Sequence, residues 1–298
     1  MLEIESIKNG VQSGNFLTLA KAISAIENNA NDATQFLESL RPSAIPIIGI
    51  TGPPGAGKST LIAALIQEWI EAGKRIAVLS VDPSSPFHQG AILGDRIRMR
   101  EWYLHPQVFI RSLASRGHLG GLNSTTIELT TLLQCAGFDM IILETVGVGQ
   151  SEVEVAALAD TTLVVLVPEA GDDIQMMKSG LMEVANIFIV NKSDRPDANA
   201  FTAHIQQMLL ENHATETSVV QTIASQKEGI GELVKAIQHH QTIAHQQSSK
   251  QRLMLSKTMQ LIVAKKMQQL DYATIETELA KAMRTSSFNI FEFAKQYY

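Results

Sequence analysis

The segment IPIIGITGPPGAGKST, residues 45–60, restricts the fold of this chain more than any other part of its sequence. It opens on a short run that is mostly isoleucine, continues as a glycine-rich loop, and leads into LIAALIQEWI, whose apolar residues recur at helical spacing. The phosphate-loop pattern G-x-x-x-x-G-K-[ST] requires this order of strand, loop and helix. The segment therefore predicts a site for a nucleotide phosphate.

The residue types of the loop suit that chemistry. Its glycines let successive backbone N–H groups point into one concavity at the positive end of the following helix. Lys58 can reach the β and γ phosphates, and the Ser59 hydroxyl can bind Mg²⁺. A plain turn between strand and helix needs neither side chain. The predicted nucleotide contacts in this loop are Gly52, Pro53, Pro54, Gly55, Ala56, Gly57, Lys58, Ser59 and Thr60.

Composition limits the other classes of protein that the chain can belong to. With 298 residues, 45% of them hydrophobic, it can bury a large core. The net charge of -6 disfavours a general nucleic-acid binder. The start, MLEIESIKNG, resembles no signal peptide, and no apolar run approaches the roughly 20 residues that span a bilayer. We expect a cytoplasmic protein without membrane insertion, and the single cysteine, Cys135, predicts a core residue.

From residue 45 to about 245, β-branched runs alternate with helical patterns, which predicts an α/β fold with a mostly parallel sheet and helices on both faces. Ligands bind such sheets beyond the carboxyl ends of the strands. The predicted strands are 46–51, 75–81, 107–111, 139–144, 161–167, 187–191 and 218–222. The predicted helices are 58–72, 122–136, 150–158, 174–184, 198–212 and 230–245.

The two flanks read differently from this P-loop domain of residues 45–245. Residues 1–44 show helical spacing without a strand signal, which predicts an N-terminal extension of two or three helices. Residues 246–298 are equally helical, and LMLSKTMQLIVAKKMQQL carries apolar stripes. A terminal stripe often packs against another subunit, so we expect a homodimer.

The motif NKSD, residues 191–194, follows the apolar run IFIV and indicates which base is bound. In an N-K-x-D loop the aspartate, here Asp194, accepts hydrogen bonds from guanine N1 and N2, while Asn191 and Lys192 shape the pocket. Adenine offers no such donors and would leave a carboxylate unpaired. A short motif alone is weak evidence, but its place after a phosphate loop predicts guanine.

Three carboxylates are candidates for the magnesium site. Glu144 ends the apolar strand of FDMIILETVGVGQSE, at a position where most GTPases have aspartate, and Gly147 can offer its N–H to the γ phosphate. Asp82 ends an earlier strand, and Asp95 lies in a loop with the composition of a nucleotide switch. The predicted metal ligands are Ser59, Asp82, Asp95 and Glu144. The predicted catalytic residues are Lys58, Asp82, Asp95, Glu144 and Gly147.

Other polar residues leave their roles open. Arg96 and Arg98 read equally well as a solvated helix start or as charges near the nucleotide. Gln150 can orient a water molecule or cap the next helix. His239 and His240 are adjacent on a helix and point to different faces, so we expect surface residues and not a pair of metal ligands.

The chain resembles the MeaB/ArgK GTPases in the order and wording of several segments: GPPGAGKST, VDPSSP, GAILGDRIRM, RSLASRGHLGGL, AGFDMIILETVGVGQSE and NKSD. These proteins belong to the G3E group of P-loop GTPases and chaperone cobalamin-dependent acyl-CoA mutases such as methylmalonyl-CoA mutase. The resemblance covers about residues 40–245. It implies that GTP hydrolysis times the delivery of adenosylcobalamin, which the partner enzyme binds.

Carried over to this sequence, the resemblance implies roles for individual residues. Lys58 and Ser59 contact the phosphates and Mg²⁺, and the three carboxylates surround the metal and the attacking water. Asn191, Lys192 and Asp194 contact guanine, and Ala224 and Ser225 supply backbone contacts to it. Residues 169–180 form a partner-sensing loop that includes Asp172, Gln175 and Lys178. Without the resemblance, this loop reads as a charged lead into an amphipathic helix.

The chain departs from the family pattern in a few places. Phe87, His88 and Gln89 stand where the family has a threonine and an extra glycine. Glu169 replaces a glycine, Ser179 often a lysine, and the C-terminal arm is shorter. TIASQKEGI, residues 222–230, differs from the usual T-S-A loop at guanine.

Two other functions share the same nucleotide core. One is a kinase associated with lysine, arginine and ornithine transport, which would place phosphate on protein. The other is a GTPase that inserts a metal into another enzyme, although such proteins usually carry clusters of Cys or His.

Overall fold

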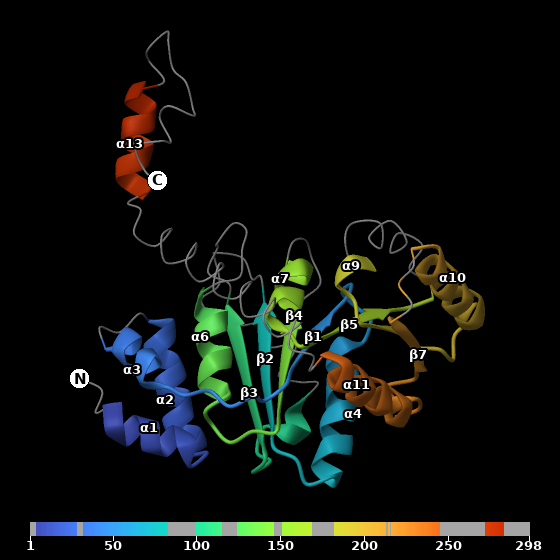
Figure 1. Cartoon of the computed structure of the whole chain (residues 1–298), viewed down its shortest axis with the longest axis horizontal. Helices are drawn as coiled ribbons and strands as arrows, with labels where there is room; N and C mark the ends of the chain where they lie inside the picture. The colour runs from blue at the N-terminus through green and yellow to red at the C-terminus, as the bar shows by residue number, and fades with distance from the viewer. Residues whose placement is uncertain are drawn as a thin grey trace.

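The computed structural model describes residues 4–28, 32–82, 99–114, 124–145, 151–168, 182–212, 214, 216–244 and 272–282. A single parallel sheet of seven strands forms its centre, in the order β3-β2-β4-β1-β5-β6-β7 (Figure 1). The strands are β1 (Ile47–Thr51), β2 (Ile76–Asp82), β3 (Val108–Ala114), β4 (Met140–Thr145), β5 (Thr161–Leu166), β6 (Ile187–Asn191) and β7 (Ser218–Thr222). All seven predicted strands are confirmed.

Helices cover both faces of the sheet, which is why its central strands are apolar on both sides. On one face, α4 (Lys58–Glu71) and α11 (Ile230–Ala244) pack over one buried cluster. On the other face lie α6 (Ser124–Leu133), α7 (Ser151–Leu158) and α10 (Ala198–Glu211). A Cβ at Gly49 of β1 would lie 2.3 Å from Val155 Cγ1, so α7 lies too close to the central strand for any larger residue.

Several element boundaries differ from the sequence-based expectation. β3 continues to Ala114, three residues beyond the predicted end, because β2 pairs with it along its whole length. α6 ends at Leu133 and not at Ala136, since the chain turns at Gly137, which has φ +68°. Of the predicted helix 174–184, the described residues contain only α9 (Met182–Val184). A 3₁₀ turn, η1 (Arg100–Trp102), precedes β3.

The predicted N-terminal helices are present as α1 (Ile4–Gln12), α2 (Phe16–Glu27) and α3 (Ala33–Ser39). Asn15 caps α2 through its side chain, which accepts a hydrogen bond from Thr18 N at 2.9 Å. The apolar sides of these helices join the core cluster that contains α6 and β3. Near the other end of the chain, α13 (Tyr272–Ala282) stands apart from the sheet (Figure 1).

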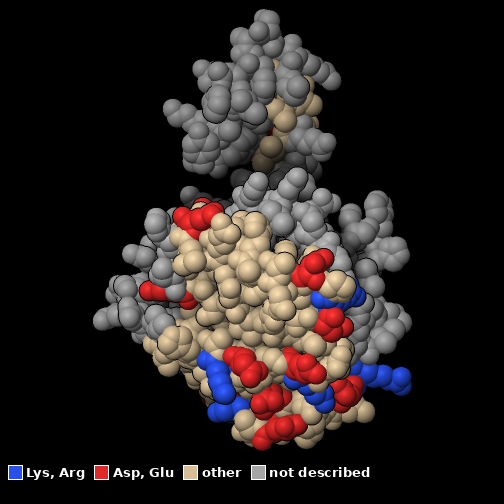
Figure 2. All heavy atoms as spheres, turned by 90° about the vertical axis from the view of Figure 1, so that its right-hand side faces the viewer, with Lys and Arg blue, Asp and Glu red and all other residues tan. Residues whose placement is uncertain are grey.

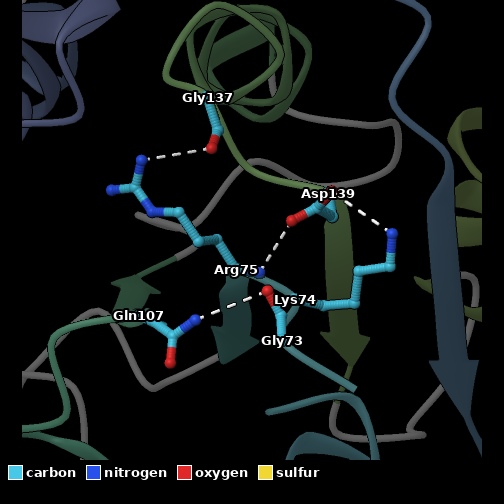
Figure 3. A network of polar contacts seen from close by, with 6 residues as sticks. All are labelled: Gly73, Lys74, Arg75, Gln107, Gly137 and Asp139. Atoms are coloured by element: carbon cyan, nitrogen blue, oxygen red, sulfur yellow. Dashed lines mark hydrogen bonds and ion pairs between the residues drawn. The ribbon is translucent and has the colours of Figure 1, made fainter.

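Arg75 joins the N-terminal helices to the amino end of the sheet. Its guanidinium donates to the carbonyl oxygens of Gly14 and Gly137, each at 3.2 Å, and lies over the rings of Phe16 and Phe138. Its backbone N–H donates to Asp139, whose carboxylate also forms an ion pair with Lys74 at 3.5 Å (Figure 3). One arginine therefore contacts two segments, residues 14–16 and 137–139, that are remote from it and from each other in sequence.

The face that carries β7, α10 and α11 has charges of both signs. Figure 2 shows acidic and basic side chains interspersed near the amino end of the sheet, with a broad uncharged area above them. No helix in the described part of the chain is long and apolar enough to cross a membrane.

Candidate functional site

The glycine-rich loop between β1 and α4 has backbone conformations that side chains rarely adopt. Gly52, Gly55 and Gly57 have φ values of +136°, +81° and +93°. A Cβ at Gly52 would lie 2.1 Å from Val165 O, and a Cβ at Gly57 would lie 2.4 Å from Asn191 Nδ2. The loop is therefore pressed against the carboxyl ends of β5 and β6, and only glycine fits at its two ends.

Two lysines donate to carbonyl groups of this loop. Lys58, at the start of α4, is 7% exposed, and its ammonium donates to Gly52 O at 2.6 Å and to Pro53 O at 3.0 Å. Lys192 reaches the loop from the end of β6 and donates to Gly55 O at 2.7 Å. Both positive charges thus lie beside the turn in which a phosphate is expected.

A buried carboxylate faces the first turn of α4. Glu144 on β4 is 5% exposed, and its Oε1 accepts from Ser59 Oγ at 3.1 Å. Its Oε2 accepts from Ser80 Oγ of the neighbouring strand at 2.9 Å. One residue further along β4, Thr145 Oγ1 donates to Thr51 Oγ1 at 3.1 Å. Ser59, Glu144 and Ser80 thus bring together hydroxyl and carboxylate oxygens, the ligands that Mg²⁺ prefers, whereas the two threonines leave the sheet on its other face.

Asn191 connects three segments at the ends of their strands. Its Nδ2 donates to Ala56 O of the glycine loop at 2.8 Å, and its Oδ1 accepts from Thr222 Oγ1 and from Ala224 N, each at 3.1 Å. Asn191 is 2% exposed, so these bonds are sheltered from water. The end of β6 therefore holds the glycine loop and the loop after β7 in a fixed relation.

The remaining predicted site residues differ in how far they are exposed to solvent. Pro53 and Ala56 are buried, whereas Pro54, Gly55, Thr60, Asp194 and Ser225 are exposed. Asp82 is the last residue of β2, and its backbone lies beside Ala114 and one residue beyond Thr145 in the sheet. Several predicted residues lie outside the described part of the chain: Asp95, Gly147, Phe87 to Gln89, Arg96, Arg98, Gln150 and the loop 169–180.

Three hydroxyl residues at this end of the sheet are missed when the sequence is read without its fold. Ser80, Thr51 and Thr222 each sit near a strand end and bond to another strand's residue. The available signal for Ser80 and Thr51 is that each is a polar residue in an otherwise apolar run, whereas Thr222 follows Gln221 and gives no such signal. Nothing in the linear sequence says which strand lies next to which.

The expectation for the two histidines is correct for His239, which is exposed, and wrong for His240. His240 is half-buried and bonds through Nδ1 to Thr161 Oγ1 at 3.0 Å. It lines a cavity of about 710 Å³ at the amino end of β6 and β7, whereas the glycine loop lies at the carboxyl end of the sheet. Burial lowers the pKa of His240 below its usual 6.5, although Glu216 and Asp160 oppose the shift.

Cys135 is partly buried and packs against the core cluster that contains α6 and β3, as expected of a core residue. Burial raises the pKa of its thiol.

The central strand of this parallel sheet leads through a glycine turn with positive φ into a helix that begins with a lysine and a serine. This arrangement defines a P-loop nucleotide-binding protein. Within this class, residues 19–278 match the family described as "Methylmalonyl Co-A mutase-associated GTPase MeaB". The chain therefore belongs to the MeaB family of P-loop GTPases.

Individual relatives agree with this assignment. A Pyrococcus horikoshii protein named as a GTPase is 38% identical over 275 residues, which cover 89% of this chain and 87% of the relative. The GTPase ArgK of Escherichia coli is 39% identical over 246 residues, which cover 78% and 74% of the two chains. The solved structure of a LAO/AO transport system kinase has a TM-score of 0.68 at 26% identity, and the match covers 99% and 96% of the chains.

Proposed function

We propose that this GTPase is a switch that assists the assembly, adenosylcobalamin loading and protection of a cobalamin-dependent acyl-CoA mutase such as methylmalonyl-CoA mutase. The description of the family, which names association with that mutase, supports the choice of partner. The observation that carries the nucleotide part is the bond of Asn191 to the glycine loop. It supports the proposal because it joins the loop expected at guanine to the loop expected at the phosphates.

The phosphate end of the site belongs to the start of α4. Lys58 already holds its ammonium against loop carbonyls, from where it can turn to the β and γ phosphates. The donor set of Ser59 and Glu144, a hydroxyl and a carboxylate, fits Mg²⁺. When bound, the metal neutralises charge on the phosphates. We propose that Asp82, Asp95 and Gly147 complete this end of the site.

The base end belongs to the loops after β6 and β7. We propose that the exposed Asp194 accepts from guanine N1 and N2, and that Asn191 and Lys192 hold its loop in place. Ala224, whose N–H is fixed on Asn191, and Ser225 border the same space. Exchange of GTP for ATP would leave the Asp194 carboxylate without donors, which favours the guanine nucleotide.

Hydrolysis proceeds by attack of water on the γ phosphorus, and the bond from the γ phosphorus to the bridging oxygen breaks. The GDP oxygen keeps the bonding electrons, and the water proton leaves with the product phosphate. Lys58 and the loop N–H groups stabilise the negative charge that spreads over the transferred group. Loss of the γ phosphate removes the contacts that order the switch loops. The surface that meets the partner therefore differs between the GTP-bound and the GDP-bound protein.

The test is GTP turnover with and without a purified cobalamin-dependent acyl-CoA mutase from the same source. We expect the mutase to accelerate turnover, and we expect a Lys58→Ala chain to show no turnover in either condition. Intact basal turnover with no response to the mutase would refute the partner while leaving the GTPase in place.

A protein kinase of amino-acid transport is a second candidate, because a structurally similar protein is named a LAO/AO transport system kinase. The two candidates differ in where the γ phosphate goes. With γ-labelled GTP or ATP, the switch releases inorganic phosphate, whereas the kinase leaves label on a protein. Label that stays on protein in amounts comparable to the nucleotide consumed would favour the kinase.

We further propose that residues 45–245 form the nucleotide domain and that residues 246–298 mediate a homodimer. Sedimentation of the full chain and of a chain that ends at residue 245 tests whether the C-terminal segment is needed for the dimer. A dimer that persists in the shortened chain would exclude the C-terminal segment as its interface.

A further inference from the structure

The second oxygen of the Glu144 carboxylate has a partner that the proposed reaction does not use. Oε1 faces Ser59 of α4, but Oε2 accepts a hydrogen bond from Ser80 at 2.9 Å. Ser80 lies on β2, in register with Glu144 on β4, so the two side chains leave the sheet on the same side. Ser80 is 3% exposed, and this contact is closed off from solvent.

Because the Glu144 side chain is long, the bond to Ser80 restricts the orientation of its carboxylate. A glutamate has one more rotatable bond than the aspartate that most GTPases have at this position, so its carboxylate has more orientations to lose. A hydrogen bond to one oxygen still lets the carboxylate turn about that bond. A second donor on the other oxygen removes the freedom, provided that the donor is itself held rigidly.

Ser80 meets that requirement. Its side chain has one carbon before the hydroxyl, and its backbone is hydrogen-bonded within the sheet between β3 and β4. Ser59 is likewise fixed, in the first turn of α4. The two hydroxyl groups therefore hold the carboxylate between a strand and a helix.

We propose that Ser80 is a positioning residue for magnesium-dependent GTP hydrolysis. Its hydroxyl holds Glu144 Oε2, so that Oε1 stays toward Ser59, where the metal is expected. The inference rests on the function proposed above for this site. Ser80 itself touches neither nucleotide nor metal and acts only through Glu144.

The sheet supplies a matched control. Ser112 of β3 lies in register with Ser80 on the side away from β4, so it leaves the sheet on the same side, one strand further out. Ser80→Ala removes the hydroxyl that reaches Glu144, whereas Ser112→Ala removes a strand hydroxyl of the same size that does not pair with β4. Ser80→Thr keeps the hydroxyl and suits a strand.

The experiment measures GTP turnover of the full chain against Mg²⁺ concentration, together with GDP affinity in EDTA and thermal unfolding. We expect Ser80→Ala to raise the Mg²⁺ concentration for half-maximal turnover about tenfold, the scale of a hydrogen bond to a charged group. Ser80→Thr restores most of this shift, Ser112→Ala leaves the wild-type value, and GDP affinity in EDTA is unchanged in all three variants.

A wild-type Mg²⁺ dependence in Ser80→Ala would overturn the proposal, and so would an equal loss of GDP affinity in EDTA, since that indicates a distorted phosphate loop. Lys58→Ala separates the two levels of inference. If it abolishes Mg²⁺-dependent turnover while Ser80→Ala changes nothing, the proposed nucleotide and magnesium site stands and the role of Ser80 fails. If wild-type turnover does not depend on Mg²⁺, the proposed magnesium site and the role of Ser80 both fail.

Discussion

The two ends of the parallel sheet carry similar polar residues and use them differently. At the carboxyl end, Lys58, Ser59 and Glu144 are nearly buried and face a glycine loop. At the amino end, Lys74 and Asp139 form an ion pair, and their own side chains are 50% and 41% exposed (Figure 3). Arg75 donates hydrogen bonds there to carbonyl groups of two neighbouring turns. One end gathers polar groups around a space for a ligand, and the other joins parts of the fold.

The difference shows why residue type alone does not mark a site. A lysine beside a carboxylate in water contributes little, because solvent screens the pair. The same groups in a sheltered place respond strongly to a ligand of opposite charge. Substitutions at matched positions of the two ends should therefore separate function from stability.

The largest contrast is expected between two lysines. Lys58→Ala should lower GTP turnover on the order of 100-fold or more, because the charge at the transferred phosphate is lost. Lys74→Ala removes only an exposed ion pair and should leave turnover and stability close to wild type. Turnover assays with thermal unfolding as a folding control measure both. Unchanged turnover in Lys58→Ala would remove the phosphate-loop assignment.

One asparagine ends β6 and another immediately precedes it, and we expect only the first to affect nucleotide binding. Asn191→Ala breaks the bonds to Ala56, Thr222 and Ala224, so we expect a loss of about 2 kcal/mol of stability and roughly tenfold weaker GDP binding. Asn186, which accepts from Thr162 N at 2.7 Å, serves as the control. Asn186→Ala should lower stability alone. Equal GDP affinity in the two variants, measured by calorimetry, would show that Asn191 does not organise the site.

Arg75 tests the amino end by itself. Arg75→Ala removes two hydrogen bonds and the contact with two aromatic rings, and should lower the free energy of unfolding by about 1–3 kcal/mol. Hydrogen exchange should rise in α1 and α2 and stay low in β1 and α4, with unchanged turnover per folded molecule. Uniformly raised exchange would instead make the helices and the sheet one cooperative unit.

The smallest effect concerns pH. Because burial lowers the pKa of His240 in the folded state, that state binds fewer protons than the unfolded chain just below pH 6.5. Stability should fall as the pH drops through 6.5 and level off below the folded-state pKa. His240→Gln should reduce this dependence, and His239→Gln should not, as measured by denaturant unfolding between pH 5 and 8. Equal slopes for the two variants would contradict the assignment.

Much of the fold follows from sequence, since all seven strands appear as apolar runs between helical patterns. Lys58, Ser59 and Asn191 were predicted as site residues for the same reason: each belongs to a motif at a strand end. Ser80, Arg75 and His240 could not be placed because their partners are 64, 62 and 79 residues away in sequence. Their roles depend on the strand order and on how helices meet the sheet, which a local pattern does not encode.

The bond between Asn191 and Ala56 joins residues 135 positions apart. During translation, the phosphate loop leaves the ribosome long before the asparagine that steadies it has been made. A nascent chain that stops short of β6 holds Lys58 and Ser59 but lacks the strand that presses on Gly57. The complete site can therefore form only after β6 has been made, so we expect tight guanine-nucleotide binding to appear late in synthesis.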